Sequence, residues 1–136
     1  MDNSVSMRWL LASNKESDQS YAQAVLIALD NTIALVPDIW RLEVSSVLLA
    51  SERQNIITQT ESDAFTSKLK TLNIFTDGLT DKQAFNSTIH IAREFNLSSY
   101  DASYLEIAIR DGLAIATLDG DLRKAAEKAN VEIYLN

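Results

Sequence analysis

The sequence contains no cysteine, and its 136 residues include only three glycines, one proline and one histidine. The lack of cysteine excludes a disulfide framework, a thiolate metal site and a cysteine nucleophile, and it fits a reducing cytoplasm. No glycine-rich segment resembles a phosphate-binding or dinucleotide-binding loop. His90 stands between apolar neighbours inside an expected helix, where a lone histidine is more often a packing or surface residue than a base. Most familiar catalytic devices are therefore excluded.

Long apolar runs are also missing. Runs such as 47–50 and 113–116 are far shorter than the roughly 20 residues that span a bilayer, so we expect a soluble chain with no membrane contact. The segment from Met1 to Ser6 has neither a basic start followed by an apolar core nor a cleavage site. The sequence therefore predicts a cytoplasmic protein.

Positive charge is scarce, with 12 basic residues against 19 acidic ones and a formal net charge of −7. This balance opposes nonspecific attraction to a polyanion such as RNA. The objection weakens if several carboxylates converge on divalent cations, which then supply the positive charge that draws phosphate in. A basic partner protein is a second way to use the acidity.

The length and the composition predict one globular domain over residues 1–136. Hydrophobic residues make up 46% of the chain and charged residues 23%, as in ordinary globular proteins. A domain of this size can bury enough apolar surface to fold without disulfides or a structural metal.

Apolar residues spaced about 3.6 apart predict five helices, over Tyr21–Leu29, Ile39–Ala50, Thr60–Lys70, Thr80–Asn96 and Ser99–Asp111. Asp38 is the expected N-cap of the second helix. Thr60 and Asp63 resemble a capping box at the start of the third. Asn96 is expected to end the fourth, and Gly112 supplies the left-handed position after the fifth.

Four short segments are strand candidates. Leu113–Thr117 is apolar on both faces, which indicates a buried strand of a parallel sheet. Ile33–Val36 and Val131–Tyr134 are two more candidates, and Leu72–Phe75 is a weaker one. Helices separate nearly every pair of strands, which predicts an α/β fold with right-handed βαβ units: a three-layer α/β/α sandwich around a mostly parallel central sheet. Functional residues in such folds lie at the carboxyl ends of the strands.

Carboxylates are the remaining candidates for chemistry. Glu43 lies inside an apolar helix, Asp101 in the first turn of another, and Asp119 just after the strand that ends at Thr117. Taken singly, each is better explained as a helix-end, turn or surface residue. Taken together with Asp2, they match the few carboxylates that Mg²⁺ sites use, and a metal so held can activate a water for attack on phosphate.

Four segments carry motifs in a fixed order along the chain. Asp2–Leu11 opens with an acid, a small residue and Ser, and ends in Trp-Leu-Leu. Val36–Val44 contains the glutamate, and Leu97–Tyr104 and Ile115–Leu122 contain the later aspartates. In these motifs, and over nearly all of its length, the chain resembles a PIN domain of the VapC-type toxin ribonucleases from bacterial and archaeal toxin–antitoxin pairs.

The resemblance implies an acidic cluster that holds Mg²⁺ or Mn²⁺ and consists of Asp2, Glu43, Asp101 and Asp119. It makes Ser4 and Thr117 hydroxyl contacts to metal, water or carboxylate. It also implies hydrolysis of RNA by a metal-activated water, an antitoxin protein as partner, and a homodimer. The homodimer has further support from three aromatic residues that exceed what a small core needs, namely Trp9, Trp40 and Tyr104. A role in the core is at least as good an interpretation of these residues.

The start of the chain departs from the family pattern. Family members begin with a short apolar strand ahead of the first aspartate, whereas only Met1 precedes Asp2 in this chain. Either the true start lies upstream or the strand is built from residues around Met1 to Ser6. This short first strand favours an alternative function, a catalytically inactive PIN-like binding or regulatory module. A third hypothesis is an α/β scaffold with surface acids that binds no metal.

Two aspartates compete for the fourth place in the cluster. Asp121 directly precedes the helix-forming residues Leu122–Lys128, so we expect it to be their N-cap. Asp119 has no such helix to cap, and Gly120 allows a sharp turn after it, so we assign the metal to Asp119.

Overall fold

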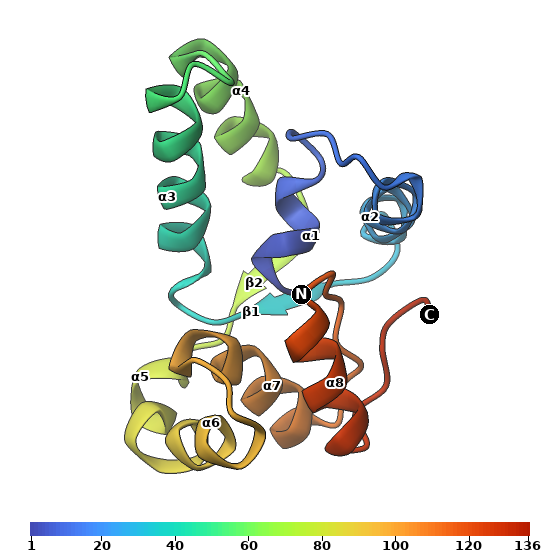
Figure 1. The fold of residues 1–136 in the computed structure, drawn as a ribbon, viewed down its shortest axis with the longest axis vertical. Helices are drawn as coiled ribbons and strands as arrows, with labels where there is room; N and C mark the ends of the chain where they lie inside the picture. The colour runs from blue at the N-terminus through green and yellow to red at the C-terminus, as the bar shows by residue number, and fades with distance from the viewer.

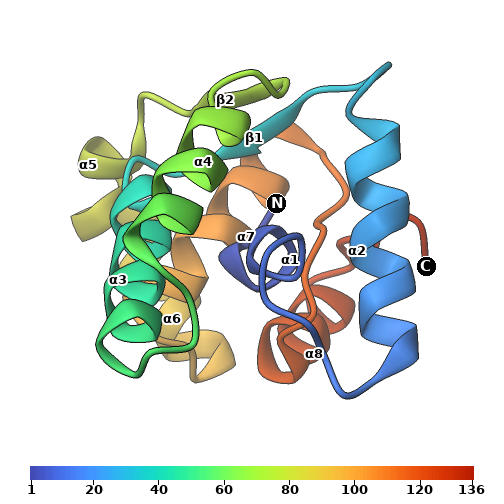
Figure 2. The ribbon, with the colours of Figure 1, turned by 90° about the horizontal axis from the view of Figure 1, so that it is seen from above.

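The computed structural model describes residues 1–136, in which helices lie on both sides of two short strands (Figure 1). In chain order the elements are α1 (Asn3–Met7), α2 (Glu16–Ala28), β1 (Ala34–Val36), α3 (Trp40–Arg53), α4 (Gln59–Leu69), β2 (Ile74–Thr76), α5 (Thr80–Gln83), the π-helical turn η1 (Ala84–Thr88), α6 (Ile89–Phe95), α7 (Ser99–Asp111) and α8 (Gly120–Lys128). Helices α1 to α4 lie on one side of the strands and α5 to α8 on the other. Seen from above, α1 lies between the α3–α4 pair and α2 (Figure 2).

Two of the four predicted strands form a parallel pair. Ala34 of β1 lies opposite Ile74 of β2, and the register continues to Val36 and Thr76. This confirms the strand predicted at Ile33–Val36 and the weaker candidate at Leu72–Phe75, each displaced by one or two residues.

The other two predicted strands are reduced to one isolated parallel bridge. Ile115 donates its N–H to Glu132 O over 2.9 Å, and Tyr134 donates its N–H to Ile115 O over 2.9 Å. No bond joins this pair directly to β1, because Met1 and Asp2 lie between them: the amino group of Met1 donates to Leu35 O and Asp2 N–H to Ala116 O. The structure thus has helices on both sides of its strands, but not the continuous central sheet that the sequence predicts.

The strand proposed around Met1 to Ser6 is wrong beyond its second residue. Only Met1 and Asp2 are extended, and the chain turns into α1 at Asn3. The helical turn carries Val5 into one apolar cluster and Met7 into the other, whereas in a strand these two side chains would point to the same face.

The helix predicted over Thr80–Asn96 is broken in the middle. Asn86 has φ −111° and ψ −109°, outside the helical region, within the π-helical turn η1. Its side-chain Nδ2 donates to Lys82 O over 3.0 Å and so competes for a backbone acceptor of the preceding turn. The predicted end is confirmed, since Asn96 has a positive φ of 53°.

Helix α7 lies at the centre of the core. It runs over the predicted range, and Gly112 follows it with a φ of 63°. Its residues from Ala102 to Ala108 are all buried, so other elements cover it on every side. None of the helices combines the length and the apolar composition that crossing a bilayer requires.

The aromatic residues expected in surplus belong to the core. Trp40 and Tyr104 are each 3% exposed, and Trp9 packs against both apolar clusters while its Nε1 donates to Ala22 O over 2.8 Å. These three side chains therefore give no support to a homodimer.

Three helix starts differ from the sequence prediction. Helix α2 begins at Glu16, five residues before Tyr21, and Ile39 occupies the N-cap position of α3 in place of Asp38. Helix α4 is capped by Thr58 with Glu61 as the reciprocal partner, two residues before the predicted box of Thr60 and Asp63.

This cap yields the first prediction. Thr58 Oγ1 accepts from Glu61 N–H over 3.1 Å, and Glu61 Oε2 accepts from Thr58 N–H over 2.7 Å. We expect Thr58→Ala to lower the free energy of unfolding by about 1 kcal/mol, as is typical of a lost N-cap. Thr60→Ala is the control, since Thr60 is exposed within the helix, and alanine there should be neutral or slightly stabilising. Urea denaturation of both variants measures this, and equal losses would contradict the observed cap.

Candidate active site

The buried carboxylate of Asp2 is the centre of the candidate site. Asp2 is 5% exposed and stands in the N-cap position of α1. Its Oδ2 accepts from Ser4 Oγ over 2.5 Å and from Thr117 Oγ1 over 2.8 Å. Of the three contacts proposed for these hydroxyls, the structure shows the contact to carboxylate. No protein hydrogen bond reaches Oδ1 of Asp2.

The two hydroxyls are themselves held by the backbone that follows Thr117. Leu118 N–H donates to Ser4 Oγ over 2.9 Å, and Asp119 N–H donates to Thr117 Oγ1 over 3.0 Å. Each hydroxyl therefore accepts from one backbone amide and donates to Asp2. This arrangement fixes the start of the chain against the segment that carries the fourth predicted acid.

Glu43 lies in the first turn of α3, half-buried, with a partner on α7. Tyr104 OH donates to Glu43 Oε1 over 2.5 Å, while no protein hydrogen bond reaches Oε2. Burial and the neighbouring Glu43 raise the pKa of Tyr104 far above its ordinary value, so this hydroxyl stays protonated. Sequence reasoning missed this role of Tyr104. The spacing could have revealed it, because Tyr104 is one turn from Asp101 on the same helix face.

Asp101 lies in the first turn of α7, and its backbone N–H donates to the N-cap hydroxyl of Ser98 over 3.0 Å. Burial raises the pKa of Asp101, and the charges of Asp2, Asp119 and Asp121 raise it further, against a hydrogen bond from Ser98.

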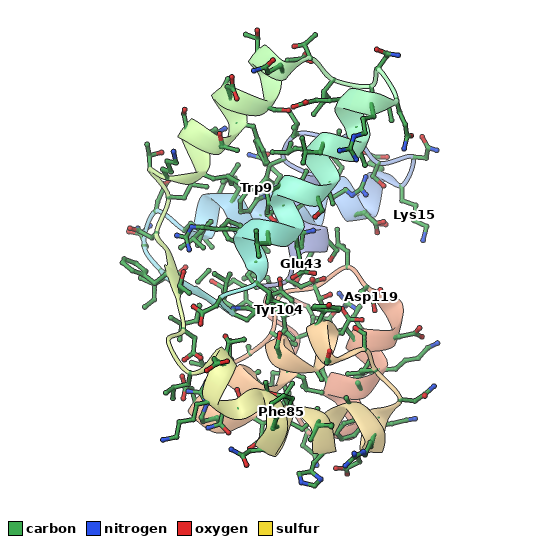
Figure 3. The ribbon with its side chains drawn as sticks, turned by 90° about the vertical axis from the view of Figure 1, so that its left-hand side faces the viewer. Trp9, Lys15, Glu43, Phe85, Tyr104 and Asp119 are labelled. Atoms are coloured by element: carbon green, nitrogen blue, oxygen red, sulfur yellow. The ribbon has the colours of Figure 1, made fainter.

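The pKa of Glu43 is raised in the same way. Burial is the largest cause, the Tyr104 hydroxyl opposes it, and the charges of Asp2 and Asp101 add to the increase. These mutual effects place the four predicted acids in one electrostatic neighbourhood. Figure 3 shows Glu43, Tyr104 and Asp119 together between the upper and the lower helices.

The assignment of Asp121 as an N-cap is wrong. Helix α8 begins at Gly120, and Asp119 is its N-cap, with Oδ1 accepting from Leu122 N–H over 2.8 Å. Asp121 lies in the first turn with its side chain 83% exposed, 3.7 Å from the amine of Lys124. The error has a physical reason: an N-cap side chain must reach the third amide of the helix, and the extended backbone at Asp119 places its carboxylate there.

The donor chemistry of this cluster fits a divalent cation. Three carboxylates are each anchored through one oxygen, which leaves Asp2 Oδ1, Glu43 Oε2 and Asp119 Oδ2 free of protein hydrogen bonds. No three acidic side chains lie close enough together to share one ion in this arrangement. Mg²⁺ commonly retains several waters and takes only one or two carboxylates, so it does not need three.

A polar groove of about 460 Å³ adjoins the cluster. Its lining includes Ser4 and Asp119 together with the basic residues Arg8 and Lys15. Lys15 lies farther out than Asp119 in Figure 3. The groove therefore joins Asp119, the one acid of the cluster that lines it, to two basic residues and to the carboxylate of Asp18.

His90 and an ion network around Arg110 lie outside the cluster. His90 is exposed on α6, as expected of a surface residue. Arg110 joins Glu106 over 2.8 Å and Asp77 over 2.9 Å, an ion network between α7 and the segment after β2 that the sequence did not suggest. Because Arg110 is paired with both carboxylates, it stabilises the contact between α7 and the segment after β2.

Comparison with known protein families gives a match to the PIN domain, over residues 1–128. The matched range contains Asp2, Glu43, Asp101 and Asp119. No curated protein matches the chain.

The raised pKa values yield a prediction about pH. A carboxylate whose pKa is higher in the folded than in the unfolded chain favours folding most at low pH, and this contribution is lost as the pH rises through the folded value. We therefore expect the metal-free Glu43→Gln/Asp101→Asn double variant to gain stability over the parent as the pH rises above the ordinary values of 4.5 and 3.8. Urea denaturation with a chelator between about pH 4 and pH 7 measures the difference. If the difference in unfolding free energy between the double variant and the parent stays constant or falls as the pH rises, burial and charge repulsion do not raise the pKa values of Glu43 and Asp101.

The capping role of Asp119 yields another prediction. Asp119→Ala should lower the free energy of unfolding by about 1 kcal/mol, because Leu122 N–H loses its partner. Asp119→Asn should lose little, because asparagine caps equally well. Asp121→Ala is the matched control and should change little, since its side chain is exposed. A larger loss of unfolding free energy for Asp121→Ala than for Asp119→Ala would show that Asp121, and not Asp119, is the N-cap of α8.

Proposed function

Because the chain belongs to the PIN domain family, whose members are generally nucleases, we propose that it is a Mg²⁺- or Mn²⁺-dependent endoribonuclease. In this proposed role, residues 1–136 act as one catalytic domain. One observation carries it: a buried aspartate held by two hydroxyls, with three further carboxylates within electrostatic reach. The sequence offers no cysteine and no buried histidine for a different nucleolytic mechanism.

The residues proposed to hold divalent cations are Asp2, Glu43, Asp101 and Asp119. No three of them reach one ion in this arrangement, so one cation would take one or two of them and complete its coordination with water. Ser4 and Thr117 orient Asp2 through Oδ2, and Tyr104 orients Glu43 through Oε1, so the opposite oxygens stay available. When bound, a divalent cation would supply an activated water and stabilise charge on the phosphoryl oxygen. The raised pKa values of Glu43 and Asp101 come first from burial and then from the charges of neighbouring acids, a repulsion that a cation would relieve.

The groove beside the cluster is the proposed path of the RNA. Arg8 and Lys15 line it together with Asp18 and Asp119, so a backbone phosphate held by the two basic residues would lie close to the carboxylate of Asp119. Contacts of this kind position a strand without reading its sequence.

The biological role that we propose is that of the toxin in a type II toxin–antitoxin pair of the cytoplasm. Its support is the motif resemblance to VapC-type ribonucleases and the net charge of −7, which suits a basic antitoxin segment as partner. The homodimer remains part of this proposal on the resemblance alone.

A second candidate is a PIN-like module that binds or regulates without cleaving. Two observations favour it: no three acids share an ion in this arrangement, and the strands are split into two pairs. Metal-dependent cleavage of RNA by the isolated protein separates the two candidates, and metal binding shows whether the acids hold a cation. A cation at about 100 times its dissociation constant should stabilise the enzyme by about 2.7 kcal/mol, whereas a module without a metal site would show no shift.

Asp101→Asn tests the proposed function directly. The substitution removes a ligand charge but keeps the shape of the side chain, so we expect RNA cleavage to fall by about 100-fold or more while the fold is retained. Cleavage of a labelled single-stranded RNA with Mg²⁺ or Mn²⁺, with and without a chelator, measures this. Asp63→Asn is the control, an exposed acid of α4 outside the cluster, and should cleave like the parent. Retained cleavage in Asp101→Asn would overturn the assignment.

A further inference from the structure

Three acids of the cluster each have one carboxylate oxygen bonded to the protein and one oxygen free of protein hydrogen bonds. Oδ2 of Asp2 accepts from two hydroxyls, Oδ1 of Asp119 caps helix α8, and Oε1 of Glu43 accepts from Tyr104. A carboxylate that chelates a cation uses both of its oxygens, whereas one-oxygen coordination uses only the free oxygen. The hydrogen bonds therefore favour one-oxygen coordination by all three acids.

Glu43 differs from the other two acids because its bonded oxygen depends on a single side chain. Two hydroxyls from different segments donate to Asp2, so the loss of one leaves the other. The donor to Asp119 is a backbone amide, which belongs to no side chain. Tyr104 OH is the only protein donor to Oε1 of Glu43, over 2.5 Å. Removal of this one hydroxyl would therefore free a second oxygen of Glu43 for a cation.

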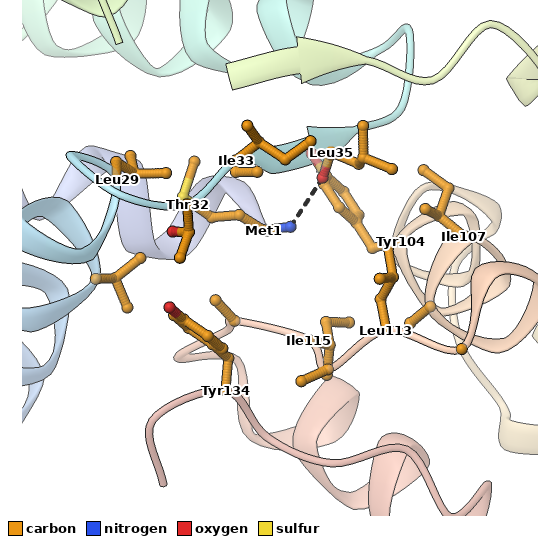
Figure 4. Close-up of a pocket in the computed structure, with 16 residues that line it drawn as sticks. Met1, Leu29, Thr32, Ile33, Leu35, Tyr104, Ile107, Leu113, Ile115 and Tyr134 are labelled. Carbon is orange, nitrogen blue, oxygen red and sulfur yellow. Dashed lines mark hydrogen bonds between the residues drawn. The ribbon is translucent and has the colours of Figure 1, made fainter. Parts of the chain in front are cut away.

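The surroundings of Tyr104 hold its hydroxyl in this contact. Tyr104 is 3% exposed, and it lines an apolar cavity of about 340 Å³ in which 14 of the 16 lining residues are hydrophobic (Figure 4). Its hydroxyl bonds to no protein group other than Glu43. If Glu43 turned both oxygens towards a cation, this hydroxyl would become a buried donor without a partner, which is costly. Tyr104 therefore opposes chelation by Glu43.

Divalent cations differ in the coordination that they prefer. Mg²⁺ requires a near-ideal octahedron of oxygens at about 2.1 Å, keeps several waters and takes one or two carboxylates, and Mn²⁺ also suits octahedral oxygen sites. Ca²⁺ takes about six to eight oxygens at about 2.3 to 2.6 Å and often gains two of them from one glutamate. Because one cation reaches only one or two acids of this cluster, the number of oxygens that each acid offers has a large effect on affinity.

We propose that Tyr104 is a positioning residue that determines which cation the cluster accepts: by keeping Glu43 a one-oxygen ligand, it favours Mg²⁺ and Mn²⁺ over Ca²⁺. This inference rests on the proposed metal-dependent function and adds the residue that sets its cation selectivity. Tyr104 acts through Glu43 and contacts neither the cation nor the RNA. Tyr104→Phe keeps the ring in its apolar surroundings and removes only the hydroxyl, so the variant should fold like the parent.

Cation binding to the whole chain tests the proposal without a measurement of nuclease activity. Calorimetry on chelator-treated protein gives the dissociation constants of Mg²⁺, Mn²⁺ and Ca²⁺ for the parent and for Tyr104→Phe. We expect the ratio of the Ca²⁺ constant to the Mg²⁺ constant to fall by about tenfold in the variant, because Glu43 then offers Ca²⁺ a second oxygen. Tyr100→Phe is the matched control, since Tyr100 lies on the same helix but is 60% exposed, and its ratio should equal that of the parent.

A second pair of variants tests whether the effect passes through Glu43. On a Glu43→Gln background the side chain has only one carbonyl oxygen, so Tyr104→Phe should no longer change the ratio of the two constants. A change that persists on this background would contradict the proposed route.

The outcomes separate this inference from the proposed function. If the parent and Tyr104→Phe both bind Mg²⁺ with the same ratio of Ca²⁺ to Mg²⁺ constants, Tyr104 does not set the selectivity, and the proposed nuclease function stands. The same holds if the hydroxyl is merely structural, because its loss would then weaken all three cations alike. If the parent binds none of the three cations, the metal site itself is wrong, and the proposed function fails together with the inference.

Discussion

The pair of hydroxyl hydrogen bonds to Asp2 is the interaction on which the rest of the site depends. Burying a carboxylate until it is 5% exposed is costly unless it is hydrogen-bonded, and Ser4 and Thr117 both donate to Oδ2 of Asp2. The bond from Thr117 to Asp2, and the bond that Leu118 N–H donates to Ser4 Oγ, each join parts of the chain more than 100 residues apart. The other carboxylates are then positioned relative to this fixed centre.

The cluster carries an electrostatic cost that the fold tolerates. Two half-buried acids have raised pKa values, caused first by burial and then by the charges around them. Charged groups held together in this way destabilise the metal-free protein at neutral pH and favour any cation that relieves the repulsion. The arrangement is therefore more consistent with selection for binding than with selection for stability.

The sequence predicted those features that local chemistry determines. Helix α7 and its glycine stop were predictable, because a clear apolar stripe and a left-handed position suffice to define them. The cap at Asp119 was not, because Asp121 two residues later could equally have adopted the N-cap backbone angles. The break at Asn86 was not, because it lies inside a segment whose apolar spacing is helical on both sides of it. For the site, motif order predicted the four acids, whereas the contact between Tyr104 and Glu43 depends on how two helices pack.

Helix α7 contributes both to the apolar core and to the acidic cluster, and this double role limits which substitutions it can accept. Seven consecutive buried residues leave it almost no solvent face, while Asp101 and Tyr104 at its start serve the cluster and Arg110 at its end holds an ion network. A substitution that alters side-chain volume there would displace the acidic residues as well as the packing. Neutral drift is therefore restricted to a few positions such as Ile109, and this segment should diverge more slowly among homologous chains than the surface helices around it.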